Sequence, residues 1–480
     1  KKQAFNPYLP SWEYVPDAEP HIVDGRVYVY GSHDLFNGIN FCLGDYVCWS
    51  APVDDLGNWT YHGCIFKREQ DPAAPKIRVT NGLAAPDMVV GPDGKYYLYY
   101  FMGGTKMISV AVCDEPAGKY EFYGYVHYAD GTIWGRKKGD QFPFDPAVLV
   151  DDDKRVWLYS GFYTSTPAIV TGCKKLKNDG GTVVELESDM VTIKTNPKVI
   201  FPKEGPGSFE NHEFFEASSI RKDGDTYVFV YSSRHNHELC YATSKRPDGD
   251  FSYGGTLVSQ GDLFLDGNED ETKAKNYLGN THGGMLNIGD DWYIFYHRQT
   301  NQHSYSRQAC AEKLLRTEEG VYKQAEVTSC GLNDGPLIAK GTYEARIACN
   351  LWSKDGVGRY DGIGVRKKLK AHPYFTQTGG DRESEGDQYI KNMRDGAVAG
   401  FKYFEFKDVD RISIEVRGSA GTIEIFVDDR LTNLIGKVDI AQKETYTEFI
   451  ADVSKIEGIY PLYFRYRGNG VIDFNSFTFN

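Results

Sequence analysis

The sequence lacks several features that would place it in common functional classes. It has no run near the ~20 consecutive apolar residues of a membrane-spanning helix, which argues against a membrane partner. Basic residues are in the minority, 54 against 67 acidic ones, and the formal net charge is -13. Binding a nucleic-acid backbone requires a basic surface, so this balance argues against a nucleic-acid partner.

Paired cysteines are also missing. The 480 residues contain nine scattered cysteines and no Cys-x-x-Cys motif, so neither a disulfide framework nor a zinc site is expected. Free thiols favour a reducing compartment, and we expect a cytoplasmic location. The opening Lys-Lys-Gln-Ala-Phe-Asn-Pro has no apolar signal-peptide core, so the protein is secreted only if such a signal was removed. The cysteines are Cys42, Cys48, Cys64, Cys113, Cys173, Cys240, Cys310, Cys330 and Cys349.

Aromatic residues are abundant and five segments share one pattern. Each segment begins with a polar residue and continues into a short apolar strand, a turn with Asp or Gly, and a second strand rich in Tyr, Val and Phe. Asp-Gly turns adopt the positive φ values that tight hairpins need. Hairpins that recur at roughly 60 to 70 residues, with no helical pattern between them, indicate a β-propeller. The segments are residues 17–34, 87–101, 145–162, 216–233 and 282–298.

We therefore predict an all-β protein with a five-bladed β-propeller over residues 1–330. The innermost strands of a propeller lie side by side around its axis, so the residues that begin them should converge. Buried carboxylates are costly unless paired or used, which favours a catalytic centre. Hydrolysis of a glycosidic bond needs one protonated and one ionised carboxyl group, and a third can raise the pKa of the acid. The converging residues are Asp17, Asp87, Asp145, Glu216 and His282.

The repeat stops near residues 331–336, Gly-Leu-Asn-Asp-Gly-Pro. Alternating strands follow, for example at 411–418, 422–429 and 462–468, with Gly and Asp turns between them. This pattern predicts an antiparallel β-sandwich over residues 337–480. The acidic, polar loop at 379–388 is interpreted as a surface excursion.

Four segments resemble the catalytic segments of glycoside hydrolase family 43, in the family's order: residues 6–22, 144–153, 215–222 and 280–283. The resemblance implies a five-bladed propeller and an inverting mechanism. It implies that Asp17 is the general base, Glu216 the general acid, and Asp145 the residue that modulates the pKa of the acid. Glu19 is an alternative base, and Glu210 and Glu213 are alternative acids.

The same resemblance implies further site residues. Asp87 and Arg307 would contact the sugar, and His282 would help to hold a calcium ion at the propeller axis, largely through water. Calcium prefers oxygen ligands, so a histidine without metal remains an alternative. Asp87 and Asp145 could instead be turn residues, and Arg307 could form a surface ion pair. His33 and Asp34 are expected only as residues of the pocket wall.

The C-terminal part has its own resemblance. Residues 386–406 and 412–426 look like a family 6 carbohydrate-binding module. Tyr389 and Trp352 could stack on a sugar there, with core packing as the alternative.

Together these features predict an exo-acting, inverting glycosidase on pentose-containing plant oligosaccharides, with β-xylosidase or α-L-arabinofuranosidase activity. A galactan-cleaving relative is one alternative, and a sugar-binding propeller without catalysis is another. A retaining fructan-acting enzyme would need an Asn-Asp-Pro-Asn type segment near the start, whereas this chain has Pro-Asp-Ala-Glu.

Overall fold

The computed structural model describes residues 1–74, 82–163, 176–360 and 370–480. Within these ranges the chain forms β-strands and a few 3-10 turns of three residues each, which confirms the all-β class. No helix in these ranges is long and apolar enough to cross a membrane. The eight cysteines in these ranges are free thiols, and Cys173 lies outside them.

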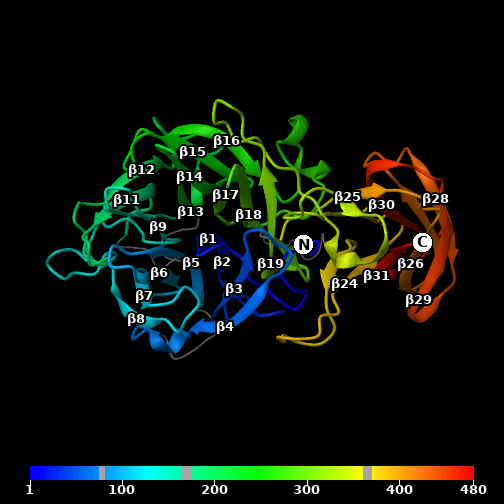
Figure 1. Ribbon diagram of the computed structural model, residues 1–480, viewed down its shortest axis with the longest axis horizontal. Helices are drawn as coiled ribbons and strands as arrows, with labels where there is room; N and C mark the ends of the chain where they lie inside the picture. The colour runs from blue at the N-terminus through cyan, green and yellow to red at the C-terminus, as the bar shows by residue number, and fades with distance from the viewer. Residues whose placement is uncertain (75–81, 164–175, 361–369) are drawn as a thin grey trace.

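Five antiparallel sheets follow one another along the chain as far as Leu314 (Figure 1). Within each sheet, neighbouring strands are also neighbours in the sequence. The first two sheets are β1 (Glu19–Val23), β2 (Arg26–Tyr30), β3 (Tyr46–Pro52) and β4 (Thr60–Phe66), then β5 (Leu83–Val90), β6 (Tyr96–Met102), β7 (Ile108–Cys113) and β8 (Glu121–Tyr125). The other three are β9 (Ala147–Val150), β10 (Val156–Ser160), β11 (Gly180–Leu186) and β12 (Lys198–Pro202), then β13 (Phe214–Asp223), β14 (Thr226–Ser233), β15 (Leu239–Ser244) and β16 (Ser252–Val258), then β17 (Met285–Ile288), β18 (Asp291–Thr300) and β19 (His303–Leu314).

The first strands of the five sheets lie nearest their common centre in Figure 1. β1 contacts β5, β5 contacts β9, β9 contacts β13, and β13 contacts β17. β17 in turn contacts β1, and a parallel bridge joins Ala18 to Gly283 just before these two strands. The residues that precede these strands are thereby brought around one axis.

A buried apolar cluster fills the space between each pair of adjoining sheets. Between the fifth and first sheets, for example, Phe295 and Ala311 pack with Val29 and Trp49. Alternate side chains of a strand point to opposite faces, so a strand between two clusters must be apolar on both. This requirement explains the continuous aromatic and aliphatic second strands, such as β6 with its sequence YYLYYFM.

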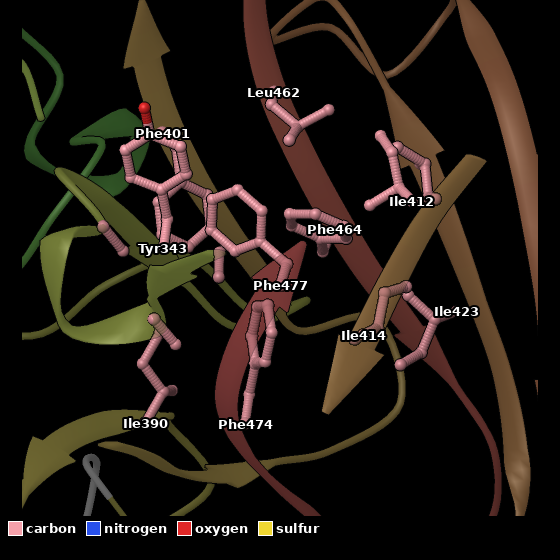
Figure 2. Packing of buried hydrophobic residues seen from close by; sticks show 14 of the residues in the cluster. Tyr343, Ile390, Phe401, Ile412, Ile414, Ile423, Leu462, Phe464, Phe474 and Phe477 are labelled. Atoms are coloured by element: carbon pink, nitrogen blue, oxygen red, sulfur yellow. The ribbon is translucent and has the colours of Figure 1, made fainter. Parts of the chain in front are cut away.

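The C-terminal part forms two six-stranded sheets with one core between them (Figure 2). Phe401 and Phe464 of one sheet pack there against Phe474 and Phe477 of the other. The first sheet contains β20 (Leu337–Ile338), β22 (Asn350–Trp352), β25 (Val398–Phe406), β27 (Gly421–Phe426), β28 (Leu434–Ile440) and β30 (Gly458–Arg467). The second contains β21 (Gly341–Glu344), β23 (Tyr374–Thr376), β24 (Tyr389–Met393), β26 (Arg411–Gly418), β29 (Lys443–Asp452) and β31 (Ile472–Phe479).

The five predicted hairpins are present as the first two strands of the five sheets. Asp24 and Gly25, with φ values of 47° and 75°, form the turn of the first hairpin, as the Asp-Gly chemistry predicts. Two details were wrong: Asp87 and Glu216 do not begin their strands, because β5 starts at Leu83 and β13 starts at Phe214, and both strands continue across bulges.

Candidate active site

A cavity of about 450 Å³ opens where the first strands of the five sheets begin. Asp17, Asp145, Glu216, His282 and Arg307 all line it. These residues are far apart in the sequence, and the tertiary structure brings them together around one cavity.

Asp17 lies two residues before β1 and takes a positive φ of 59°, which an aspartate tolerates better than most residues. Its Oδ2 accepts a hydrogen bond from Ser32 Oγ at 2.6 Å, and its Oδ1 accepts one from Arg307 Nη1 at 3.0 Å. Burial by itself would raise the pKa of Asp17, but the positive charges of Arg307 and His282 and the hydrogen bond from Ser32 lower it below the usual value. Asp17 is therefore ionised.

A second aspartate holds Arg307 in place. Asp34 Oδ2 accepts from Arg307 Nε at 2.8 Å and Asp34 Oδ1 accepts from Arg307 Nη2 at 3.0 Å. Both side chains are almost fully buried, and the paired fork geometry fixes the plane of the guanidinium. Asp34 does not line the cavity, so it orients Arg307 from behind.

Asp145 and Glu216 are linked through the backbone of β13. Asp145 Oδ2 accepts from the Ala217 N–H at 3.0 Å, next to Glu216 in a bulge of the strand. Burial, and to a lesser extent the negative charge of Asp17, raise the pKa of Asp145 to about 7. Burial and the nearby Asp145 raise the pKa of Glu216 well above its usual value. Glu216 is therefore protonated at a pH at which Asp17 is ionised.

His282 lies among three carboxylates. Its Nδ1 is 4.0 Å from Asp17 Oδ1 and 3.8 Å from Asp145 Oδ2, and its Nε2 is 3.7 Å from Glu19 Oε1. Burial opposes protonation of the ring, but Glu19, Asp145 and Asp17 together raise the pKa of His282 to about 9. The imidazolium partly balances the negative charge of the site.

Five phenylalanines contribute to the rest of the cavity wall: Phe41, Phe101, Phe144, Phe162 and Phe215. Phe144 packs against Phe101 with ring centroids 4.7 Å apart and against Phe162 at 4.6 Å, and Phe162 packs against Phe215 at 5.4 Å. Phe41 lines the cavity near Arg307. Flat apolar rings beside a few fixed charges suit the faces and hydroxyl groups of a sugar.

Besides Asp34, two other predicted site residues do not line the cavity. Asp87 is fully buried, and its carboxylate bonds His21 Nε2 at 2.7 Å and the Val148 N–H at 2.9 Å. It thereby joins the first three sheets. His33 donates from Nδ1 to the Asp45 carbonyl and bonds Glu13 through Nε2 at 2.9 Å.

The alternative carboxylates, Glu19 for the base and Glu210 and Glu213 for the acid, do not line the cavity either. Glu19 is buried in β1 against Arg221 and Ser219, with its Oε2 2.8 Å from Arg221 Nη2. Glu213 pairs with His235 at 3.1 Å, and Glu210 is exposed. Among the candidates weighed for each role, only Asp17 and Glu216 line the cavity.

Neither His297 nor Ser32 was expected from the sequence. His297 in β18 is fully buried, accepts from the Asp17 N–H through Nδ1 at 3.3 Å, and donates from Nε2 to the Asn280 carbonyl at 2.8 Å. Burial and the charge of Arg307 lower the pKa of His297 to about 3, so it is neutral. A histidine inside a strand has no sequence feature that distinguishes a site residue from a core residue. The only signal for Ser32 was its position next to His33 and Asp34.

An ionised and a protonated carboxyl group in one aromatic cavity define a site for general acid–base catalysis on a small polar substrate. Comparison with known proteins identifies the family. Residues 14–322 match the model of the glycosyl hydrolases family 43. A xylosidase/arabinosidase of Thermoclostridium stercorarium is 50% identical over 483 residues, covering 100% of this chain and 99% of the relative. The chain belongs to glycosyl hydrolases family 43.

Two solved structures resemble this one. A family 43 β-xylosidase/α-arabinofuranosidase from a compost microbial metagenome, in complex with xylotriose, has a TM-score of 0.51 and 25% identity, covering 68% of this chain and 98% of that one. An arabinoxylan arabinofuranohydrolase from Bacillus subtilis, in complex with cellotetraose, has a TM-score of 0.51 and 20% identity, covering 98% and 96%. The second shows a likeness of fold that includes the C-terminal part.

Proposed function

We propose that this enzyme is an exo-acting glycosidase that releases xylose or arabinose from plant oligosaccharides, with β-xylosidase or α-L-arabinofuranosidase activity or both. The observation that carries the proposal is one cavity lined by Asp17, Asp145 and Glu216, with opposite pKa shifts at Asp17 and Glu216. A cavity of about 450 Å³ suits a short saccharide end. The name of the 50% identical relative, xylosidase/arabinosidase, supports pentose as the sugar.

In the proposed reaction, Glu216 donates its proton to the departing glycosidic oxygen. Asp17 removes a proton from a water molecule whose oxygen forms the new bond to the anomeric carbon on the opposite face, so the configuration inverts. Asp145 keeps Glu216 protonated by like-charge repulsion and holds the β13 bulge through the Ala217 N–H. Arg307 keeps Asp17 ionised and oriented.

We propose that the five sheets are the blades of a β-propeller, residues 1–330, and that residues 337–480 form a β-sandwich domain related to family 6 carbohydrate-binding modules. The cyclic contacts of the first strands and the shared core of the two larger sheets support this division. Trp352 packs against Tyr463, and Tyr389 lies beside Arg417 and Tyr446, which favours structural roles for both.

A calcium ion near His282 is a further part of the proposal. His282 Nε2 and Glu19 Oε1 are buried without a hydrogen bond and face each other at 3.7 Å. Glu19 offers the oxygen ligand that calcium prefers, and water would supply most of the others. A bound cation would displace the proton of His282 and favour ionised carboxylates around it. The cytoplasmic location stays a prediction.

The test is hydrolysis of a panel of aryl pentosides and aryl hexosides, with the anomer of the first product followed by NMR. We expect turnover of the β-xyloside or the α-L-arabinofuranoside and release of the inverted anomer. Glu216→Gln should lower kcat by roughly 10²–10⁴ and leave substrate binding in place. A retained anomer would overturn the roles of Asp17 and Glu216. Turnover of a galactoside alone, or binding without turnover, would favour the galactan-cleaving or the non-catalytic alternative.

A further inference from the structure

The C-terminal part contacts the first part of the chain, near the cavity, through residues 377–386. Gln377 Oε1 accepts a hydrogen bond from Tyr14 Oη at 2.6 Å, and both side chains are buried. The Tyr14 ring in turn packs against Phe36, with centroids 5.5 Å apart. The interpretation of this loop as a surface excursion therefore needs correction: several of its side chains are exposed, but it is docked on the first part of the chain.

Asp381 makes the most direct contact with the segment that walls the cavity. Its Oδ1 accepts from the Phe36 N–H at 2.7 Å, across 345 positions of the sequence. Residues 35–42 form no strand, so this segment has no ladder of backbone hydrogen bonds to hold its shape. Side chains such as Asp381 must therefore provide the hydrogen bonds to its backbone that neighbouring strands provide within a sheet.

A second anchor comes through Asn301, at the turn between β18 and β19. Its N–H donates to the Phe375 carbonyl at 2.8 Å, and its Oδ1 accepts from Thr376 Oγ1 at 3.0 Å. Its Nδ2 donates to Asn37 Oδ1 at 3.0 Å. β23 of the C-terminal part is thus connected to the same segment by a second route.

The anchored segment ends at the cavity. Asn40, Phe41 and Cys42 line it, and the Phe41 ring packs edge-on against Tyr305 at 4.8 Å. Ile39 and Phe41 are 67% and 36% exposed, which is unusual for apolar side chains beside a polar site. Of the two, only Phe41 carries a ring, and an exposed ring that lines a saccharide cavity can stack on a sugar unit.

We propose that Asp381 and Gln377 are positioning residues for the 35–42 segment, and that Phe41 on this segment determines specificity by contacting the sugar on the leaving-group side of the cleaved bond. The proposal rests on the glycosidase function proposed above. It makes the C-terminal part a component of substrate recognition. The sugar in the closed part of the cavity touches the acids and the Phe144 wall instead.

The experiment compares Asp381→Ala, Asp381→Asn and the exposed control Glu385→Gln with the unmodified protein. Hydrogen exchange of the peptide covering residues 35–42 is measured by mass spectrometry, and kcat and KM are measured for xylotriose and an aryl xyloside. We expect D381A to speed exchange and to raise KM for xylotriose by roughly three- to ten-fold, as loss of one hydrogen bond allows. The kcat on the aryl xyloside should stay within twofold. D381N keeps an acceptor oxygen and should behave like E385Q. Phe41→Ala should raise the KM for xylotriose without changing hydrogen exchange elsewhere in the protein.

Unchanged exchange in D381A would overturn the positioning role, whatever the activity. Faster exchange with an unchanged KM for xylotriose in both D381A and F41A would overturn the role in recognition. If the unmodified protein hydrolysed no pentoside, the proposed function would fail, whereas the exchange measurement would still decide the positioning role.

Discussion

The opposite ionisation of Asp17 and Glu216 follows from which charges lie beside each carboxylate. Both are buried, and burial alone would raise both pKa values. Arg307 donates a hydrogen bond to Asp17, and its positive charge lowers the pKa of Asp17 despite burial. The negative charge of Asp145 instead adds to the effect of burial and raises the pKa of Glu216 further. One cavity thus holds an acid and a base at the same pH.

We expect a bell-shaped dependence of kcat/KM on pH. Because the pKa of Asp17 lies below its usual value, activity should persist into acid solution and fall only when Asp17 is protonated. Because the pKa of Glu216 is raised, activity should fall on the alkaline side as Glu216 loses its proton. Initial rates on an aryl pentoside, measured from acid to alkaline pH with enzyme stability checked at each pH, test this. An alkaline limb that stays in place in Glu216→Gln would contradict the assignment.

Asp34→Asn should destabilise the protein. Asparagine has one acceptor oxygen where Asp34 uses two, and its amide group would face the donors of Arg307. Breaking a buried charge pair costs about 3–5 kcal/mol, so we expect a loss of that order in the free energy of unfolding from urea titration. Asp408→Asn, at an exposed position, is the control. A loss below about 1 kcal/mol would mean that Asp34 is not needed to balance Arg307.

Among the elements, β13 is distorted at the site. Its register with β14 shifts on both sides of Glu216, and Ala217 takes a φ of 69°. The bulge directs the Ala217 N–H to Asp145 and the neighbouring carboxyl group into the cavity. Bulges next to active sites commonly re-aim one side chain in this way.

Ala217→Val should therefore lower activity, although valine is only two methyl groups larger than alanine. A β-branched residue is strongly disfavoured at positive φ, so the bulge should relax and withdraw the N–H from Asp145. We expect kcat/KM on an aryl pentoside to fall at least about ten-fold, the effect of roughly 1.4 kcal/mol. Ala217→Gly, which accepts this φ freely, should keep most of the activity. Equal activity of the two variants would show that the bulge geometry does not matter.

At the scale of the whole molecule, buried polar contacts lock the two parts together. Lys402 Nζ of β25 lies 2.7 Å from Glu326 Oε1 and 3.3 Å from Asp262 Oδ2, and Lys402 is almost fully buried. Arg298 of β18 donates to the Ala348 carbonyl and lies 3.7 Å above the Phe375 ring. The C-terminal part is thus joined to the first part of the chain by buried polar contacts.

Lys402→Met should destabilise the whole chain in a pH-dependent way. It leaves Asp262 buried without its partner, which costs about 3–5 kcal/mol when the carboxylate is ionised. Burial already raises the pKa of Asp262. A raised folded-state pKa means that stability is lost as pH rises, so the difference from the unmodified protein should shrink at acid pH. Urea unfolding at neutral and acid pH measures this, with the exposed Lys407→Met as control. A loss independent of pH would contradict it.

The sequence indicated those site residues whose neighbours carry a local signal. Asp17, Asp145, Glu216 and His282 were found because polar residues at recurring strand starts interrupt an apolar pattern, whereas Arg307 was expected only from the family resemblance; all five line one cavity. Their catalytic roles stay predictions. Asp87 was placed at the head of its strand because a bulge in β5 hides the register. His297 was missed because a buried strand histidine has no local signature.

The sequence by itself determined the all-β class, the five hairpins and the C-terminal strands, because turn chemistry and the alternation of side chains act between near neighbours. Only the tertiary structure decided which charge lies beside each acid. Asp17 meets Arg307 across 290 positions, and Phe36 meets Asp381 across 345. Such contacts set the pKa values and the cavity wall, and they depend on how the sheets pack around the axis.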